Sequence, residues 1–175
     1  MHHSMCVKLL ELPVRGRQWD WQVPQKQLQD AALGAVVPIA EACSDAAWQG
    51  EIKRLGDVYE LQGRWQLDVK RECSRCNASF VQALQGDCQR EFCVGEKPDD
   101  DTENECEVLE PPGELDLLDV LREEIWLSWR QIVLCSSDCK GLCLGCGENL
   151  NLSHCRCVKD ETDHPLAALR KLKFD

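Results

Sequence analysis

The feature that most constrains this chain is a run of six cysteines near its carboxyl end, at positions 135, 139, 143, 146, 155 and 157. Cys143 and Cys146 share a short turn with glycines at 145 and 147, and Cys155 and Cys157 follow after a short loop. Two thiol pairs that face each other can surround a zinc ion with Zn–S distances of about 2.3 Å. Glycine lets the backbone amides turn toward the sulfurs. The pattern predicts a structural zinc on Cys143, Cys146, Cys155 and Cys157.

A further thiol pair, Cys73 and Cys76, lies far upstream. A second zinc would need two more ligands, and Cys135 and Cys139 are the candidates that remain, so one or two zinc ions are expected. The alternatives are a single zinc that draws on Cys139, or free thiols at the upstream pair; His154 could also replace a cysteine. A structural zinc contributes on the order of 10–16 kcal/mol of folding free energy.

The chain has thirteen cysteines, an odd number, and its start shows neither a secretory segment nor an Arg-rich leader. This indicates reduced thiols in the cytoplasm rather than a disulfide scaffold. The five cysteines without motif spacing are expected to be small buried hydrophobic residues: Cys6, Cys43, Cys88, Cys93 and Cys106. No apolar run approaches the roughly 20 residues of a membrane span.

The net charge of −11 is confined to one part of the chain. Residues 94–124 hold thirteen acidic and two basic residues, whereas the remainder holds 18 of each. We call residues 94–124 the acidic belt. The sequence therefore indicates a balanced protein that carries one acidic surface.

Two strands are predicted in the middle of the chain. Residues 59–69 alternate apolar and polar side chains, with Gly63 as an expected bend or bulge, and residues 80–94 are also strand-like. The segment Cys73-Ser74-Arg75-Cys76 would lie at the tip of this long hairpin. Strands on both sides of the thiol pair disfavour a thioredoxin-like role, which requires a helix amino terminus beside the pair.

The predicted fold class is α+β: an antiparallel sheet with a long hairpin, a packed helix and a C-terminal cysteine-rich zinc-knuckle segment. Residues 1–134 would form the α+β domain, with an acidic surface loop at about 95–113, and residues 135–175 the zinc-binding segment. Helices are expected at 25–33, 115–129 and 163–173, whereas residues 36–40 are a strand or a loop.

Basic residues accompany both cysteine groups: Arg75 beside the first pair, and Lys140 and Arg156 in the second cluster. They could neutralise sulfur charge or contact phosphates. No carboxylate pair has a His or Ser partner at a plausible spacing, so no catalytic site, small-molecule substrate or enzymatic activity is predicted.

The ordered motifs resemble the YceD family, the large ribosomal RNA subunit accumulation proteins. They are the strand that ends in Cys73-Ser74-Arg75-Cys76, the acidic loop, the segment 114–118, the run from Cys135 to Asn151, Cys155-Arg156-Cys157, and the ending at 165–169. The match covers roughly residues 50–173. Leu144 stands where the family often has proline.

The resemblance implies a role in making or stabilising the large-subunit ribosomal RNA. Two modes are compatible with the residues: basic groups near the cysteines could touch the RNA, or the acidic belt could hold a basic large-subunit ribosomal protein. The charge distribution favours the second mode. The alternative class is a cysteine-based redox or metal-handling protein.

Overall fold

The computed structural model describes residues 5–28, 41–95 and 106–157. The chain divides into two compact units. Unit 1 comprises Met1–Arg71 and Phe80–Gln131, and unit 2 comprises Glu72–Ser79 and Ile132–Asp175. Unit 2 therefore includes a piece of chain that lies between two long strands, in addition to the cysteine-rich segment.

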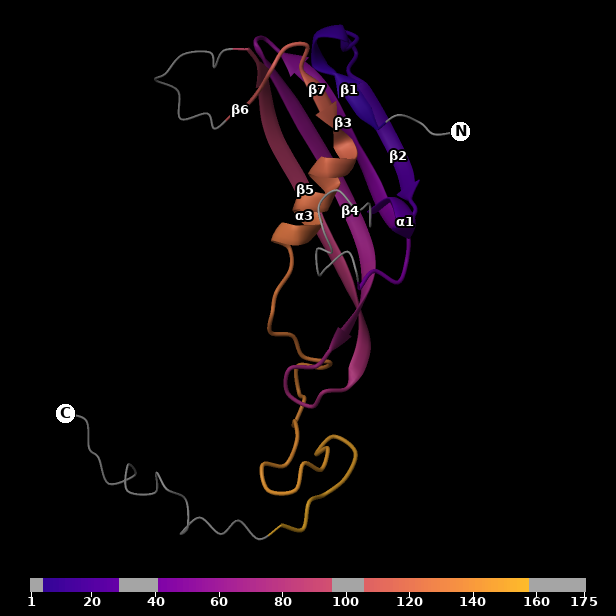
Figure 1. Ribbon diagram of the computed structural model, residues 1–175, viewed down its shortest axis with the longest axis vertical. Helices are drawn as coiled ribbons and strands as arrows, with labels where there is room; N and C mark the ends of the chain where they lie inside the picture. The colour runs from indigo at the N-terminus through magenta and orange to yellow at the C-terminus, as the bar shows by residue number, and fades with distance from the viewer. Residues whose placement is uncertain (1–4, 29–40, 96–105, 158–175) are drawn as a thin grey trace, which may run out of the picture. The chain divides into compact units, whose positions relative to one another are not determined.

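A five-stranded sheet dominates the described residues of unit 1, with the strand order β2-β3-β4-β5-β6 (Figure 1). The β2–β3 and β3–β4 pairs are antiparallel, and β6 is parallel to β5. The strands are β2 (Arg17–Val23), β3 (Ala46–Leu55), β4 (Val58–Glu72), β5 (Ser79–Val94) and β6 (Glu107–Leu109). The predicted long hairpin of β4 and β5 is confirmed, and the fold is mixed and rich in strands.

Shorter elements complete unit 1. Strand β1 (Cys6–Lys8) pairs with β7 (Glu114–Asp116) in a separate two-stranded sheet, and η1 (Leu9–Glu11) and α1 (Gln25–Leu28) are single turns. Helix α3 (Leu117–Leu127) begins where the Asp116 carboxylate accepts a hydrogen bond from the Leu118 amide at 2.8 Å, which satisfies a free N–H of the first turn. Among the described residues, no helix combines the length and apolarity that a membrane crossing requires.

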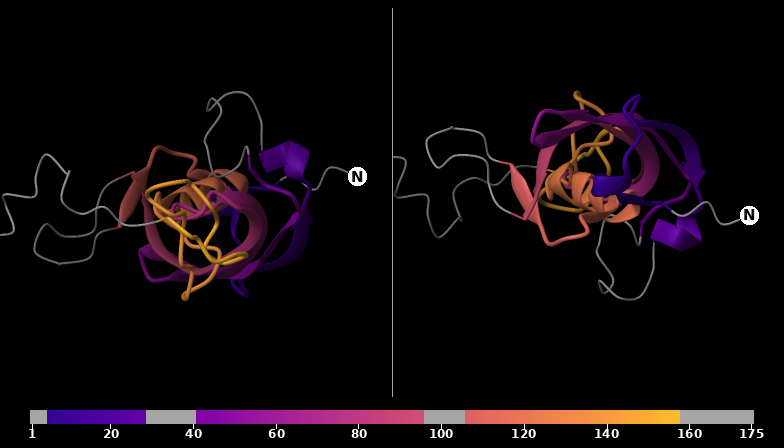
Figure 2. Two further views of the ribbon diagram at one scale, coloured as in Figure 1. Left: turned by 90° about the horizontal axis from the view of Figure 1, so that it is seen from below. Right: turned by 90° about the horizontal axis from the view of Figure 1, so that it is seen from above.

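The hydrophobic core lies between α3 and the inner face of the sheet, which curves around the helix (Figure 2). The sheet contributes Trp48, Trp65 and Phe92, and α3 contributes Leu121 and Ile125, all of them buried. Burial of each such side chain contributes about 1.5–3 kcal/mol. The period-2 alternation in β4 reflects this arrangement, because only one face of the strand meets the core.

Gly63 serves a purpose other than the predicted bend. It pairs with Gly50 in an uninterrupted β3–β4 register. A Cβ atom at Gly63 would lie 2.6 Å from the Trp48 ring. The prediction of a bulge was therefore wrong, because the missing side chain makes room for a buried indole.

Several other predictions need correction. Strands β2 and β3 were not predicted, the sheet has one parallel pair, and α3 starts at Leu117 because residues 114–116 form β7. The acidic loop expected at about 95–113 contains β6, whose Leu109 packs against the core. The remainder of that loop at 96–105, the residues 29–40 and the C-terminal helix at 163–173 lie outside the described residues.

Two of the expected buried thiols are in fact paired. Cys93 and Cys106 form a disulfide with a Cα–Cα distance of 6.0 Å. The parallel alignment of β6 with β5 places Val108 opposite Cys93, and this brings Cys106 beside the same strand. Cys43 is exposed rather than buried, whereas Cys88 is buried as predicted.

Candidate metal centres

The eight cysteines of the two predicted sites gather into two groups within unit 2. Quartet A is Cys73, Cys76, Cys135 and Cys139, and quartet B is Cys143, Cys146, Cys155 and Cys157. Within each quartet, all four sulfur atoms lie within 4.8 Å of one another. Four sulfurs at 2.3 Å from a central zinc would be about 3.8 Å apart. The donor atoms and their spacing therefore fit a tetrathiolate zinc in both quartets, although ligation itself stays a prediction.

Quartet A is assembled from two distant segments. The hairpin tip closes with hydrogen bonds from the Cys73 amide to the Ala78 carbonyl and from the Asn77 amide to the Cys73 carbonyl, both at 2.9 Å. The Ser74 amide then donates to the Val133 carbonyl at 2.8 Å, and the Val133 amide donates to the Ser74 hydroxyl at 3.1 Å. These bonds align the tip with the segment that leads into Cys135 and Cys139.

Quartet B is built from one continuous stretch. The Cys143 amide donates to the Glu148 carbonyl at 2.8 Å, and the Gly147 amide donates to the Cys143 carbonyl at 2.9 Å. Gly147 has a φ of 76°, which favours glycine at this turn. The amide of Gly145 donates to the Cys143 sulfur at 3.4 Å, as expected for a turn that presents a thiolate to a metal.

Both quartets contain thiols with a lowered pKa: Cys73 and Cys139 in quartet A, and Cys143 in quartet B. For Cys143, backbone N–H donors from Cys146 and Gly145 lower the thiol pKa to about 6. For Cys73, burial raises the pKa, but backbone donors, the strongest from Cys135, outweigh it and bring the pKa to about 6. Amide donors stabilise the thiolate, which is the form that binds metal.

The neighbouring thiols are affected in the opposite sense. The adjacent sulfur of Cys76, together with burial, raises the pKa of Cys135 to about 12. The sulfurs of Cys155 and Cys146 likewise raise the pKa of Cys157 to about 12. Clustered thiolates repel one another, and a divalent cation offsets that repulsion while its binding releases the thiol protons.

The two quartets differ in their exposure to solvent. In quartet A, Cys73, Cys76 and Cys139 are buried, and Cys135 is exposed. In quartet B no cysteine is buried. The side chain of His154 is exposed and is not part of either four-sulfur group.

The basic residues singled out in the sequence occupy different positions. Arg75 donates through Nη1 to the Cys139 carbonyl at 2.7 Å, and its Cγ lies 2.7 Å from where a Cβ of Gly141 would be. Arg75 thus supports the backbone of quartet A. Lys140 and Arg156 are exposed, which leaves them accessible to a partner.

A residue that the sequence reasoning missed is Asn151. Its Nδ2 donates to the Cys139 sulfur at 3.4 Å, and its Oδ1 accepts from the Lys140 amide at 2.7 Å. Its place in the segment Asn149-Leu150-Asn151 was the available signal, although nothing in that segment indicated contact with Cys139.

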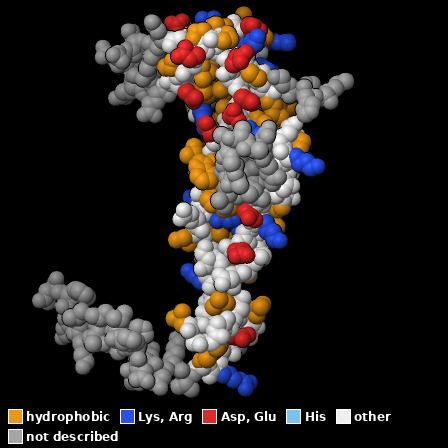
Figure 3. Space-filling view, viewed as in Figure 1, with side chains coloured by type: hydrophobic (Ala, Val, Ile, Leu, Met, Phe, Trp, Pro, Cys, Tyr) orange, Lys and Arg blue, Asp and Glu red, His pale blue; other side chains and the backbone are white. Residues whose placement is uncertain are grey.

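Acidic side chains gather on unit 1 around β6, β7 and α3 (Figure 3). Arg90 lies among three of them: Glu124 at 2.8 Å, Glu123 at 2.5 Å and Glu107 at 4.0 Å. Glu107 and Glu123 remain more than half exposed. Arg122 pairs with Asp119 at 2.7 Å, so two arginines balance only part of the charge of the acidic belt.

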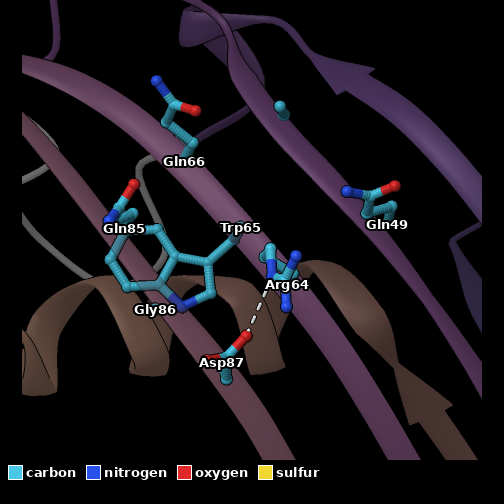
Figure 4. A pocket seen from close by; sticks show the side chains of 8 residues that line it. Gln49, Arg64, Trp65, Gln66, Gln85, Gly86 and Asp87 are labelled. Carbon is cyan, nitrogen blue, oxygen red and sulfur yellow. Dashed lines mark hydrogen bonds and ion pairs between the residues drawn. The ribbon is translucent and has the colours of Figure 1, made fainter.

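Unit 1 also has a pocket of about 400 Å³ on its sheet (Figure 4). Gln49, Gln66 and Gln85 lie around it, and Arg64 and Asp87 form an ion pair at 3.0 Å at its edge. The lining residues include no histidine, cysteine or serine. The pocket therefore offers three side-chain amides for hydrogen bonding, beside a carboxylate that is paired with an arginine.

Comparison with known proteins connects this geometry to a family. The family model described as "Large ribosomal RNA subunit accumulation protein YceD" matches residues 61–173. The chain belongs to the YceD family. The matched range contains β5, α3 and both cysteine quartets of this YceD-family protein.

The chain is also similar to the large ribosomal RNA subunit accumulation protein YCED homolog 1, chloroplastic, of Arabidopsis thaliana. The two are 39% identical over 61 residues, which are 33% of this chain and 19% of that relative. The chain thus matches about a fifth of the relative's length. No solved structure matches.

Proposed function

We propose that this protein is a non-enzymatic factor that supports the accumulation of large-subunit ribosomal RNA, with a structural zinc ion in each quartet. In this proposal, the acidic belt binds a basic large-subunit ribosomal protein and keeps it available for assembly. The zinc ions stabilise unit 2, and the cysteines act as ligands rather than as redox groups.

The observation that carries the proposal is that the excess negative charge lies on unit 1, whereas the cysteine quartets lie on unit 2. The described acids of the belt lie on unit 1, where Arg90 pairs with three of them and Arg122 pairs with Asp119. The described residues of unit 2 hold three acidic and three basic residues. A zinc ion with four thiolates has a net charge of −2, so loaded quartets would make unit 2 negative as well. Such a surface attracts basic proteins and repels RNA phosphates.

Membership of the YceD family and the printed name of the chloroplastic relative support the link to large-subunit ribosomal RNA. The zinc ions would be held by the eight quartet sulfurs, and they would supply cross-links rather than chemistry, because four protein ligands leave no open position for a substrate. The cytoplasmic location expected from the sequence stays a prediction.

The proposal can be tested by neutralising part of the acidic belt. Replacing Asp99, Asp100 and Asp101 with asparagine removes three charges from a segment of the belt. Association with purified basic large-subunit ribosomal proteins, measured by stopped flow at low salt, should slow about tenfold, because complementary charge accelerates encounter.

A matched control removes three exposed acids elsewhere: Asp20, Asp57 and Asp138, each changed to asparagine. This variant has the same net charge but an intact belt, and it should retain most of the wild-type association rate. If both variants slowed equally, the protein would respond to net charge alone. If neither slowed, or if the wild-type protein bound none of the basic proteins, capture by the acidic belt would be refuted.

A further inference from the structure

The side chain of Asn151 contacts both parts of unit 2 that hold the quartets. Its Nδ2 donates to the sulfur of Cys139, a member of quartet A, at 3.4 Å. Asn151 itself lies in the loop between Cys146 and Cys155, both of which belong to quartet B. A single amide therefore links a sulfur of one quartet to the loop that the other quartet closes.

The orientation of this amide is fixed by its surroundings. Its Oδ1 accepts from the Lys140 amide at 2.7 Å, so Nδ2 must face the sulfur. The Oδ1 atom of Asn149 accepts from both the backbone amide and Nδ2 of Asn151, at 3.0 and 2.9 Å. If the amide were flipped, its N–H would face the Lys140 N–H, and its oxygen would face the Cys139 sulfur and the Asn149 oxygen. All of these side-chain hydrogen bonds would then be lost.

The backbone around Asn151 is tied to the start of the quartet B turn. The Leu150 amide donates to the Gly141 carbonyl at 2.9 Å, and Leu142 forms a β-bridge with Asn149. The sulfurs of Cys146 and Cys155 lie 3.4 Å apart at the two ends of the loop. A metal that joined these sulfurs would close the loop and hold Asn151 beside Cys139.

Resting on the zinc binding proposed above, we propose that Asn151 is a positioning residue that couples the two sites. Metal in quartet B orders the loop, the ordered loop directs the Asn151 N–H to the Cys139 thiolate, and this hydrogen bond raises the affinity of quartet A for zinc. Hydrogen bonds to a metal's ligands typically change metal affinity by about 10–100-fold. The coupling is reciprocal, because linkage between two binding sites acts in both directions.

The test compares two substitutions that add the same charge. Asn151→Asp keeps the oxygen that accepts from the Lys140 amide but replaces the N–H donor with a second oxygen. Asn149→Asp adds its charge two residues away and keeps the oxygen that accepts from Asn151. Asn151→Ala removes the side-chain hydrogen bonds to Cys139, Lys140 and Asn149 without adding charge. Zinc stoichiometry is measured by native mass spectrometry, and zinc affinity by competition with a chromogenic chelator.

The quartets are distinguished by a second change, Cys143→Ser with Cys146→Ser, which removes two ligands of quartet B. In an otherwise wild-type chain, this change should lower the zinc affinity of quartet A by about 10–100-fold. Asn151→Asp and Asn151→Ala should each lower it to a similar extent, and Asn149→Asp by a few-fold at most. In the Asn151→Asp background, loss of quartet B should have little further effect.

Three results would overturn the coupling. The first is that Asn151→Asp and Asn149→Asp lower the zinc affinity of quartet A equally. The second is that removal of quartet B lowers this affinity in the Asn151→Asp chain as much as in the wild-type chain. The third is that the zinc affinity of quartet A does not depend on quartet B. In all three cases the wild-type chain still binds two zinc ions, so the proposed function survives. A wild-type chain that binds zinc in neither quartet would refute the proposed zinc sites and the coupling together.

Discussion

The two quartets use the same four ligand atoms but differ in how the chain assembles them. In quartet A, Cys73 lies 66 residues before Cys139, and Cys76 lies 59 residues before Cys135. In quartet B, Cys146 and Cys155 are nine residues apart. Quartet A is mostly buried, whereas quartet B is partly or fully exposed. The first arrangement joins distant segments, and the second shapes a local loop.

This difference predicts unequal contributions to stability. The entropy lost when a loop closes grows with its length, by about 0.6 kcal/mol for each doubling. A cross-link over about 60 residues therefore restricts the unfolded chain by about 1.5 kcal/mol more than one over about ten residues. We expect quartet A to determine whether unit 2 folds, and quartet B to determine the conformation of the loop that follows.

The largest effect is expected when quartet A is removed by Cys73→Ser with Cys76→Ser. One zinc should be lost, together with folding free energy on the order of 10 kcal/mol. The amides of Ser74 and Val133 should then lose their protection in hydrogen exchange. The matched variant, Cys143→Ser with Cys146→Ser, should also lose one zinc but keep most of that protection. Equal loss of protection in the two variants would remove the distinction between the quartets.

A core substitution in unit 1 tests whether the quartets depend on the sheet. Ile125 is fully buried on α3, and Ile125→Ala should lower the free energy of unfolding of unit 1 by about 2–5 kcal/mol. Both zinc ions should remain, because all eight ligands belong to unit 2. Thermal unfolding with parallel zinc analysis measures both quantities. Loss of zinc from the folded variant would contradict the claim that the zinc sites depend on unit 2 alone.

Release of zinc to a chelator should separate the quartets by rate. No cysteine of quartet B is buried, whereas three of the four cysteines of quartet A are buried, so we expect quartet A to release zinc only after a local opening. An opening free energy of only about 1.4 kcal/mol would slow release tenfold. Stopped-flow measurements should show two phases of equal amplitude, and the fast phase should be absent from the Cys143→Ser, Cys146→Ser variant. A single phase in the wild-type protein would argue against the difference in exposure.

The smallest effect is expected at Cys43, an exposed thiol of unit 1 that belongs to neither quartet. Cys43→Ser should change the free energy of unfolding by less than about 0.5 kcal/mol and leave two zinc ions bound. The backbone amide of Cys43 donates a hydrogen bond to the Asp68 carbonyl, and this bond does not involve the side chain. A change in zinc stoichiometry would mean that the ligand sets are wrong.

Local patterns predicted the parts of this fold that depend on local contacts. The alternation in β4 identified the hairpin, and the spacing of Cys143, Cys146, Cys155 and Cys157 indicated which residues the structure brings together in quartet B. The thiols left over then indicated quartet A. Thiol spacing is informative because few other roles require cysteines so close together.

The elements that escaped prediction depend on contacts between distant residues. Gly63 suggested a bend, yet its partner Trp48 lies on a different strand. The pairing of Cys93 with Cys106 depends on β6 running parallel to β5. The contact of Asn151 with Cys139 depends on a loop conformation that residue spacing does not encode.

The central claim is that two tetrathiolate zinc ions hold unit 2 together. The most direct test is X-ray absorption, combined with native mass spectrometry, on protein purified without chelator. The account predicts two zinc ions per chain, each with four sulfur neighbours at about 2.3 Å. A metal-free protein whose unit 2 remained protected from hydrogen exchange would contradict it. So would quartet thiols that reacted immediately with a thiol reagent before any chelator was added.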